Sequence, residues 1–220
     1  MCLPGGSAIM NSSMKHKTET AGLSGGPASK PEWIRVRLGQ DAGFKRTRSI
    51  VREAGLHTVC EEALCPNMGT CWRHGRATVM ILGKACSRSC RFCNVSSLRP
   101  GPPDNDEPRR VAATVREMGL KEVVITSVTR DDLPDGGAAI WAETVRRIRK
   151  TVPEVVLEVL IPDFGGSEEA LETVLDAGPQ IVGHNLEMSP AFYPALRPQA
   201  DYERSVEVLR RSHARGFITK

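Results

Sequence analysis

An alternation of strand-like and helix-like segments constrains the fold of this chain more than any other feature of its sequence. Five apolar runs rich in β-branched residues lie at 78–83, 122–128, 155–162, 180–187 and 216–220. Helical patterns occupy the intervals between them, at 107–118, 138–151, 167–177 and 202–215. This alternation predicts βαβ units and a parallel sheet. Five strands are fewer than the eight of a closed barrel, so we expect an open or partial (β/α) barrel, with a doubly wound sheet as the alternative.

Polar and thiol side chains gather directly after the predicted strands. The first strand is followed by "KACSRSCRFCN" at 84–94, the second by "TRDDLPDGG" at 129–137 and the third by "DFGGS" at 163–167. The fourth ends in "HNLE" at 184–187. Barrels and open α/β sheets build their sites at the carboxyl ends of the strands. We therefore expect a catalytic face at this edge of the sheet.

Length and charge narrow the class of protein. A chain of 220 residues is long enough for one sizeable core. A net charge of +4 is compatible with an acidic protein partner but too weak to indicate nucleic acid. No apolar run approaches the ~20 residues that span a bilayer, and no secretory signal is visible. We expect a cytoplasmic protein that binds neither membrane nor nucleic acid.

The composition also predicts how the chain is divided. Residues 1–30 are rich in Gly, Ser and Thr without a sustained period, which is typical of a disordered leader. Residues 31–77 form an N-terminal extension, in which 45–63 predicts a helix that runs into a group of cysteines. Residues 78–220 form the partial barrel.

Six of the seven cysteines fall into two groups of three. Cys60, Cys65 and Cys71 have the spacing C-x4-C-x5-C, and Cys86, Cys90 and Cys93 have the spacing C-x3-C-x2-C. Soft thiolates in such groups suit iron–sulfur clusters or zinc. An iron–sulfur cluster usually has four Cys ligands, so a loop with three leaves one iron open to a small molecule. The alternative is zinc, with His57 or His74 completing a tetrahedral site.

The second cysteine group carries a resemblance to a known family. "CSRSCRFC" after the first strand resembles the signature of radical S-adenosylmethionine enzymes. "VCEEALCPNMGTCW" resembles the lipoyl synthases more specifically, as do "PEWIRVRL", "ATVMILGKAC", "VVITSVTRDDLPDGGA", "PDFGG", "HNLE" and "RPQADYERS". The match covers about residues 31 to 220.

The resemblance implies a fold and an activity. The fold would be a partial (β/α) barrel of the radical S-adenosylmethionine type, and the activity the insertion of two sulfur atoms at C6 and C8 of a protein-bound octanoyl chain. Cys86, Cys90 and Cys93 would hold a [4Fe–4S] cluster that binds S-adenosylmethionine. The first group would hold an auxiliary [4Fe–4S] cluster that serves as the sulfur source. An unactivated C–H bond resists acid–base catalysis, so the cofactor supplies a radical.

The same resemblance implies partners. The octanoyl chain would arrive on a lipoyl-carrier domain or on a protein like the H protein of glycine cleavage. A flavodoxin or a ferredoxin would supply low-potential electrons. Two other functions remain open at this point: another radical S-adenosylmethionine enzyme with an auxiliary cluster, and a zinc-stabilised binding module without catalysis.

Further side chains at the strand ends are candidates for binding S-adenosylmethionine. They are Phe92, Thr126, Ser127, Asp131, Asn185, Glu187 and Arg197. Phe92 would lie near the adenine or, equally, in the core. Asp131 and Asp132 could instead cap the helix that follows them. Gly136 and Gly137 would allow a ligand to approach the backbone closely.

The chain departs from the pattern of the lipoyl synthases in three places. "MS" at 188–189 follows "HNLE", which puts the geometry of the Glu187 loop in question, and Thr129 replaces a commoner acid. The third departure is at the end of the chain. The family continues to a serine that ligates the auxiliary cluster, whereas this sequence ends at Lys220. We expect a barrel that is incomplete at its C-terminus.

Overall fold

The computed structural model describes residues 42–62 and 65–220. The predicted leader at 1–30 and the first segment of the extension, 31–41, lie outside the described residues. Among the described residues, no helix is both long and apolar enough to cross a membrane.

The described part of the N-terminal extension contains three helices and one short strand before β2 (Arg76–Ile81). They are α1 (Ala42–Glu53), β1 (His57–Thr58), α2 (Val59–Glu62) and α3 (Met68–Arg73). The prediction of one helix over 45–63 is therefore wrong. Gly55 adopts a left-handed φ of 61°, which ends the first helix, and β1 then pairs antiparallel with the next strand. The sheet consequently has six strands, one more than the sequence predicts.

The remainder of the chain alternates strands and helices as expected. The strands are β2 (Arg76–Ile81), β3 (Glu122–Ser127), β4 (Val156–Leu160), β5 (Ile181–Gly183) and β6 (Ile218–Thr219). The helices between them are α4 (Glu107–Glu117), α5 (Ala138–Thr151), α6 (Glu168–Leu175), α7 (Tyr193–Leu196) and α8 (Tyr202–Ala214), with 3₁₀ turns η2 (Phe164–Gly166) and η3 (Pro190–Phe192). All five segments predicted as strands and all four predicted as helices are present.

The order of the strands decides between the two predicted architectures. The sheet runs β1-β2-β3-β4-β5-β6, and every pair from β2 onward is parallel. A doubly wound sheet reverses its strand order at a switch point, and this sheet does not. Because crossovers between parallel strands are right-handed, an unreversed order puts the connecting helices on one face, as in the wall of a barrel. The sheet is open, and the partial barrel is confirmed.

Alternate side chains of the strands separate the two faces of the sheet. Val79, Ile125 and Leu157 are fully or almost fully buried beneath the helices, where they join one core with Trp141 of α5. Their neighbours in sequence face the concave side, where Thr126 is half-buried. The concave side is accessible only in part, because Met80 and Glu158 on it are buried.

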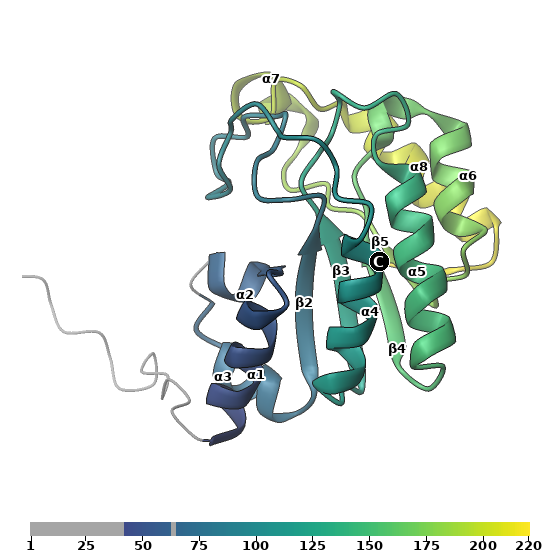
Figure 1. Ribbon diagram of the computed structural model, residues 1–220. Helices are drawn as coiled ribbons and strands as arrows, with labels where there is room; N and C mark the ends of the chain where they lie inside the picture. The colour runs from purple at the N-terminus through teal and green to yellow at the C-terminus, as the bar shows by residue number, and fades with distance from the viewer. Residues whose placement is uncertain (1–41, 63–64) are drawn as a thin grey trace, which may run out of the picture. The chain divides into compact units, whose positions relative to one another are not determined.

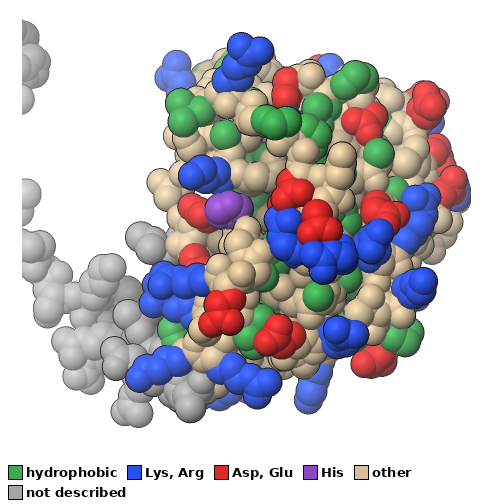
Figure 2. All heavy atoms as spheres, viewed as in Figure 1, with side chains coloured by type: hydrophobic (Ala, Val, Ile, Leu, Met, Phe, Trp, Pro, Cys, Tyr) green, Lys and Arg blue, Asp and Glu red, His purple; other side chains and the backbone are tan. Residues whose placement is uncertain are grey.

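The register of the strands brings the following loops to one edge. Met80, Thr126, Leu160 and Gly183 are partners in one row across four strands. Figure 1 shows the loops that follow these strands at the top of the view, with α4 and α5 in front of the sheet. On the face seen in Figure 2, Lys and Arg side chains are interspersed with Asp and Glu. The loops that follow β2, β3, β4 and β5 therefore lie together at one edge of the sheet.

Candidate functional site

The second cysteine group lies on a loop that is closed by hydrogen bonds at its base and is also bonded to a neighbouring segment. Cys86 N donates a hydrogen bond to Ser96 O at 2.9 Å, which closes the loop, and Ala85 and Ser96 form a β-bridge. Arg91 N donates to Leu196 O at 2.9 Å, which attaches the loop to the end of α7. The loop is thus held over the ends of the strands.

The three thiols of this loop are free and close together. Cys86 and Cys90 are half-buried and Cys93 is exposed. Burial raises the pKa of the Cys90 thiol; the Arg197 guanidinium opposes this rise, and the neighbouring Cys86 and Cys93 add to it. Soft thiols that sense one another's charge fit the donor set of an iron–sulfur cluster.

Cys86 differs from the other two because backbone N–H groups point at its sulfur. Its Sγ accepts hydrogen bonds from Arg88 N at 3.4 Å and from Thr129 N at 3.3 Å. One amide comes from its own loop and the other from the segment after β3. The position of the Cys86 sulfur therefore depends on how the cysteine loop is joined to the segment after β3.

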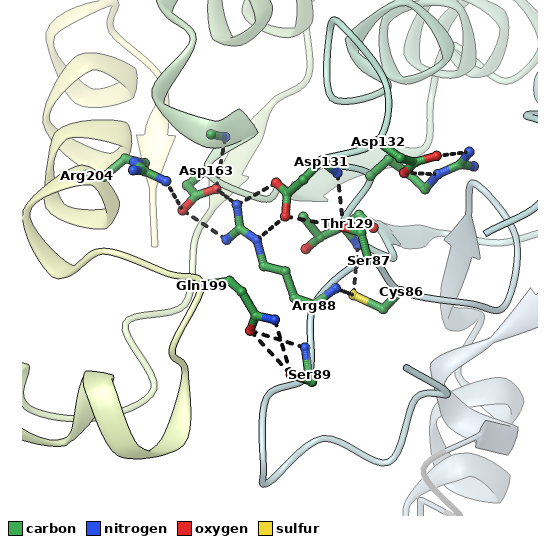
Figure 3. Close-up of polar contacts among 12 residues, drawn as sticks. Cys86, Ser87, Arg88, Ser89, Thr129, Asp131, Asp132, Asp163, Gln199 and Arg204 are labelled. Carbon is green, nitrogen blue, oxygen red and sulfur yellow. Dashed lines mark hydrogen bonds and ion pairs between the residues drawn. The ribbon is translucent and has the colours of Figure 1, made fainter. Parts of the chain in front are cut away.

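Arg88 joins the cysteine loop to the ends of β3 and β4 (Figure 3). Its Nε and Nη2 donate to Asp131 at 2.7 and 2.8 Å, and its Nη1 and Nη2 donate to Asp163 at 3.0 and 2.6 Å. Burial lowers the pKa of Arg88, but the hydrogen bonds to both carboxylates outweigh it and raise the pKa above its ordinary value. Burial raises the pKa of Asp163, and the bond from Arg88 reverses this, so its pKa is lowered. Arg88 and Asp163 therefore both carry their charges.

The alternative role of Asp131 and Asp132 as helix caps is wrong. The carboxylate of Asp135 accepts hydrogen bonds from Gly137 N and Ala139 N, both at 2.9 Å, and so caps α5 instead. Asp131 binds Arg88, and Asp132 binds Arg130 Nε and Nη2, each at 2.9 Å. Neither aspartate reaches the helix because α5 begins only at Ala138, after the Gly136–Gly137 turn, with Gly137 as its N-cap residue.

The two glycines of this turn face protein, not open space for a ligand. A Cβ at Gly136 would lie 3.1 Å from Phe164 Cδ1, and one at Gly137 would lie 2.5 Å from Leu82 Cδ1. The expectation of close ligand approach is therefore wrong. Gly137 is needed because a side chain there would overlap Leu82.

Replacing Gly137 with alanine should lower stability more than the same change at Gly178. Both residues have left-handed backbones, with φ of 86° and 80°, so both variants carry a similar strain. Only at Gly137 does the new methyl group meet a buried side chain; nothing lies within 4 Å at Gly178. We expect Gly137→Ala to be less stable than Gly178→Ala by about 1–3 kcal/mol, measured by urea denaturation. Equal losses would show that Leu82 moves aside without cost.

A cavity of about 130 Å³ opens beside the cysteine loop at the carboxyl ends of β3, β4 and β5. Its walls include five of the seven side chains predicted to bind S-adenosylmethionine, namely Thr126, Ser127, Asn185, Glu187 and Arg197. Arg88, Asp163 and His184 line it too. Phe92 and Asp131 do not. The side chain of Phe92 is 49% exposed, so the alternative that it packs in the core is wrong.

Three buried polar atoms of residues that line this cavity have no hydrogen-bond partner among the described residues. They are Ser127 Oγ, His184 Nε2 and Arg197 Nε. Such groups are costly to leave unpaired. Because these atoms are buried, the polar groups that the cavity offers to a ligand such as S-adenosylmethionine are those of its wall, among them Thr126, Asn185 and Glu187. The cavity therefore fits this cofactor in its chemistry.

His184, like Arg88 and Asp163, is a polar residue of this cavity that sequence reasoning missed. Its Nδ1 lies 2.7 Å from Ile161 O; because a carbonyl only accepts, Nδ1 carries the proton. Burial lowers the pKa of His184, so the ring is neutral and Nε2 is an acceptor. A lone histidine in "HNLE" gave no signal beyond its place at a strand end.

The loop around Glu187 is held in an uncommon backbone conformation. Glu187 has a φ of 66°, which non-glycine residues rarely adopt. Its Oε1 accepts from Asn185 Nδ2 at 3.0 Å, and Arg197 Nη1 donates to Asn185 O at 3.1 Å. Strain of this kind gathers at ligand-binding sites.

The first cysteine group is also a set of free thiols that influence one another. Cys60 of α2 is buried, and Cys65 and Cys71 are half-buried. Burial raises the pKa of the Cys60 thiol, and the neighbouring Cys65 and Cys71 raise it further. The two groups are linked, because Asn94 Nδ2, next to Cys93, donates to Glu62 O at 3.0 Å.

The two histidines considered as zinc ligands each have one ring nitrogen beside an acceptor. His57 Nδ1 lies 3.6 Å from Glu62 Oε1, and His74 Nδ1 lies 2.8 Å from Thr70 O, contacts that a histidine binding metal through Nε2 also makes. Within 42–62 and 65–220, no three His, Cys, Asp or Glu side chains gather closely enough to hold a single metal ion. A four-iron cluster takes each thiolate on a different iron, so its ligands are spread more widely.

Comparison with known proteins agrees with this chemistry. The Radical SAM superfamily matches residues 80–220. Among curated relatives, the lipoyl synthase of Nitratidesulfovibrio vulgaris is 52% identical over 190 residues, which are 86% of this chain and 64% of that protein. The lipoyl synthase of Chlorobaculum tepidum is 48% identical over 191 residues, with 86% and 66% covered. This chain thus spans slightly less than two thirds of the length of these relatives.

Solved structures support the fold alone. Methylornithine synthase superposes with a TM-score of 0.52 at 15% identity, covering 83% of this chain and 51% of that one. HydG, a maturase of the [FeFe]-hydrogenase, gives a TM-score of 0.50 at 16% identity, covering 80% and 45%.

Proposed function

Because this chain belongs to the radical S-adenosylmethionine superfamily, we propose that it acts as a lipoyl synthase, inserting two sulfur atoms at C6 and C8 of a protein-bound octanoyl chain. The curated relatives, which are about 50% identical to this chain in sequence, are named lipoyl synthase. The observation that carries the proposal is the presence of two groups of three free cysteines, linked through Asn94 and Glu62. A radical reaction that consumes sulfur needs both groups near one substrate.

Cys86, Cys90 and Cys93 are proposed to hold the cluster that the superfamily uses with S-adenosylmethionine. When bound, the two cofactors supply the one-electron chemistry that removes hydrogen from an unactivated carbon. The task of the protein is to place the thiolates and leave one coordination position open. The free thiols and the fixed loop base suit that task.

The cavity is proposed to bind S-adenosylmethionine through donors and acceptors of opposite kinds. The Arg197 guanidinium in its wall can donate, the side-chain oxygens of Asn185 and Glu187 can accept, and the Thr126 hydroxyl can do either. Thr126, Asn185 and Glu187 line the same cavity. Phe92 and Asp131 are proposed to contact the cofactor at the margin of the cavity, because both belong to the segments that frame it.

Cys60, Cys65 and Cys71 are proposed to hold the second, auxiliary cluster as the sulfur source. They belong to the N-terminal extension, 31–77, while the radical chemistry belongs to the barrel, 78–220. The extension would then supply sulfur, and the barrel would generate the radical. The disordered leader at 1–30 remains a prediction without a role.

The proposed partners follow from the reaction. The substrate would be an octanoylated lipoyl-carrier domain or a protein like the H protein of glycine cleavage, and a flavodoxin or ferredoxin would supply electrons. Free thiols suit a reducing compartment such as the cytoplasm.

The test is a single-turnover reaction under anaerobic conditions. The reconstituted protein, S-adenosylmethionine, a chemical reductant and an octanoylated carrier domain are combined, and the carrier lysine is analysed by mass spectrometry. Formation of lipoyl-lysine only when S-adenosylmethionine is present supports the proposal. Cleavage of S-adenosylmethionine without any sulfur on the carrier would indicate another radical enzyme, and zinc in place of iron and sulfide would indicate a binding module.

A further inference from the structure

Arg88 lies between two proposed cluster ligands, yet it is among the most deeply buried charged residues of the site. Its side chain is 5% exposed, and it makes four charge-assisted hydrogen bonds to Asp131 and Asp163. A planar guanidinium is suited to such two-pronged binding, whereas an ammonium is not. The position therefore depends on arginine in particular and not on positive charge alone.

The two carboxylates come from different regions of the fold. Asp131 follows β3, and Asp163 follows β4. Asp163 is itself fixed, because its Oδ1 accepts from Gly165 N at 3.1 Å and its Oδ2 lies 3.6 Å from Arg204 Nη1. Arg88 thus ties the loop after β2 to the ends of the next two strands in the sheet.

Stability alone is a poor explanation for this arrangement. Desolvating buried charges costs about as much as their pairing returns, and apolar replacements of buried ion pairs are often neutral or stabilising. What a buried ion pair specifies well is position. The segment that is positioned here contains Cys86, Cys90 and Cys93.

The consequence of this positioning is visible at Cys86. The amide of Arg88 itself and the amide of Thr129, two residues before Asp131, both donate to Cys86 Sγ. A second tie keeps these segments together, since Ser87 N donates to Thr129 O at 3.0 Å and Asp131 N donates to Ser87 Oγ at 3.0 Å. Hydrogen bonds to cluster sulfurs stabilise the more negative, reduced state and so raise the reduction potential.

We propose that Arg88 is a positioning residue that, by binding Asp131 and Asp163, holds the backbone amides of Arg88 and Thr129 against Cys86 and thereby sets the reduction potential of the cluster on this loop. The inference rests on the proposed cluster at Cys86, Cys90 and Cys93. It does not depend on the substrate or on the formation of lipoyl product.

The decisive variant is Arg88→Lys, which keeps the positive charge but loses the two-pronged geometry. Arg130→Lys is a matched control. Arg130 is 2% exposed, binds the Asp132 carboxylate with two hydrogen bonds, and donates to Leu82 O and Gly101 O. It lies in the same segment after β3, and its contacts with the loop after β2 are at Leu82 and Gly101, outside the part between Cys86 and Ser96 that carries the cysteines.

The measurement is an anaerobic redox titration of the reconstituted full chain without carrier substrate. The electron paramagnetic resonance signal that changes on adding S-adenosylmethionine identifies the cluster to follow. For Arg88→Lys we expect the reduction equilibrium constant to fall by about fivefold to tenfold, the size of one lost hydrogen bond; tenfold corresponds to ~59 mV for one electron. For Arg130→Lys we expect no change of potential.

Asp163→Asn provides a second test, because it weakens the same tie from the other side, and we expect a shift in the same direction. Loss of iron in Arg88→Lys but not in Arg130→Lys would also support the proposal. A wild-type potential in a fully loaded Arg88→Lys protein would overturn it. Equal shifts or equal iron loss in both arginine variants would overturn it too, because Arg88 would then have only the general structural role of a buried arginine.

Discussion

Replacing Cys86 with alanine should abolish cleavage of S-adenosylmethionine. Cys86 is one of three thiols on the loop after β2, and its sulfur receives two backbone hydrogen bonds. Without it, a cluster on this loop would keep only two protein ligands. Mutating residues that hydrogen-bond to metal ligands lowers metal affinity or activity by about 10–100-fold. Loss of a ligand itself should therefore reduce cleavage by at least about 100-fold. The measurement is the rate of 5′-deoxyadenosine formation by chromatography.

The matched control for this variant is Cys2→Ala, which changes the cysteine outside both groups. It should leave the rate unchanged. Circular dichroism would show whether the Cys86→Ala protein keeps its fold, which is expected because Cys86 is half-buried. A folded Cys86→Ala protein that forms 5′-deoxyadenosine at the wild-type rate would disprove the assignment of this loop.

Replacing Cys65 with alanine should eliminate the lipoyl product while leaving cleavage of S-adenosylmethionine largely intact. Cys65 is half-buried and belongs to the group in the N-terminal extension, which does not line the cavity proposed for the cofactor. We expect lipoyl-lysine below detection and 5′-deoxyadenosine formation within about tenfold of wild type. That tolerance corresponds to ~1.4 kcal/mol at the transition state.

The two cysteine variants form a pair, and their contrast is the test. If Cys65→Ala makes the full amount of lipoyl product, this group does not supply sulfur. If both variants lose cleavage together, the two groups form one functional unit. Iron and acid-labile sulfide contents of each variant show how much of each cluster is retained.

The architecture was largely predictable because it depends on local patterns. The β-branched runs and the helical intervals are properties of short segments, and each appears in the structure. The helix expected over 45–63 failed for two reasons. Gly55 ends it locally with a left-handed backbone, and His57 pairs with Met80 of a strand that comes later in the chain. The membership of the radical S-adenosylmethionine superfamily that the cysteine motifs suggest is confirmed by the match over residues 80–220.

The cavity wall was predictable in part, but the contacts that support the cysteine loop were not. Spacing predicts the two cysteine groups as cluster ligands, which stays a proposal, and position at strand ends predicts Thr126, Ser127 and Arg197, which line the cavity. Arg88 and Asp163 are 75 positions apart, and nothing in either segment signals the pairing. His184 was missed for a related reason, since an unpaired Nε2 is a property of the folded cavity.

The unreversed strand order has a consequence for how the protein is made. Neighbouring strands of the sheet follow one another in the chain, so the sheet can grow strand by strand as synthesis proceeds from the N-terminus. The contacts of Arg88 span 43 and 75 positions, so they close only after β3 and β4 have been synthesised and paired. Until the ribosome has passed Asp163, the cysteine loop lacks the tie that positions it. We therefore expect the proposed cluster to enter a correctly placed loop only late in the synthesis of the chain.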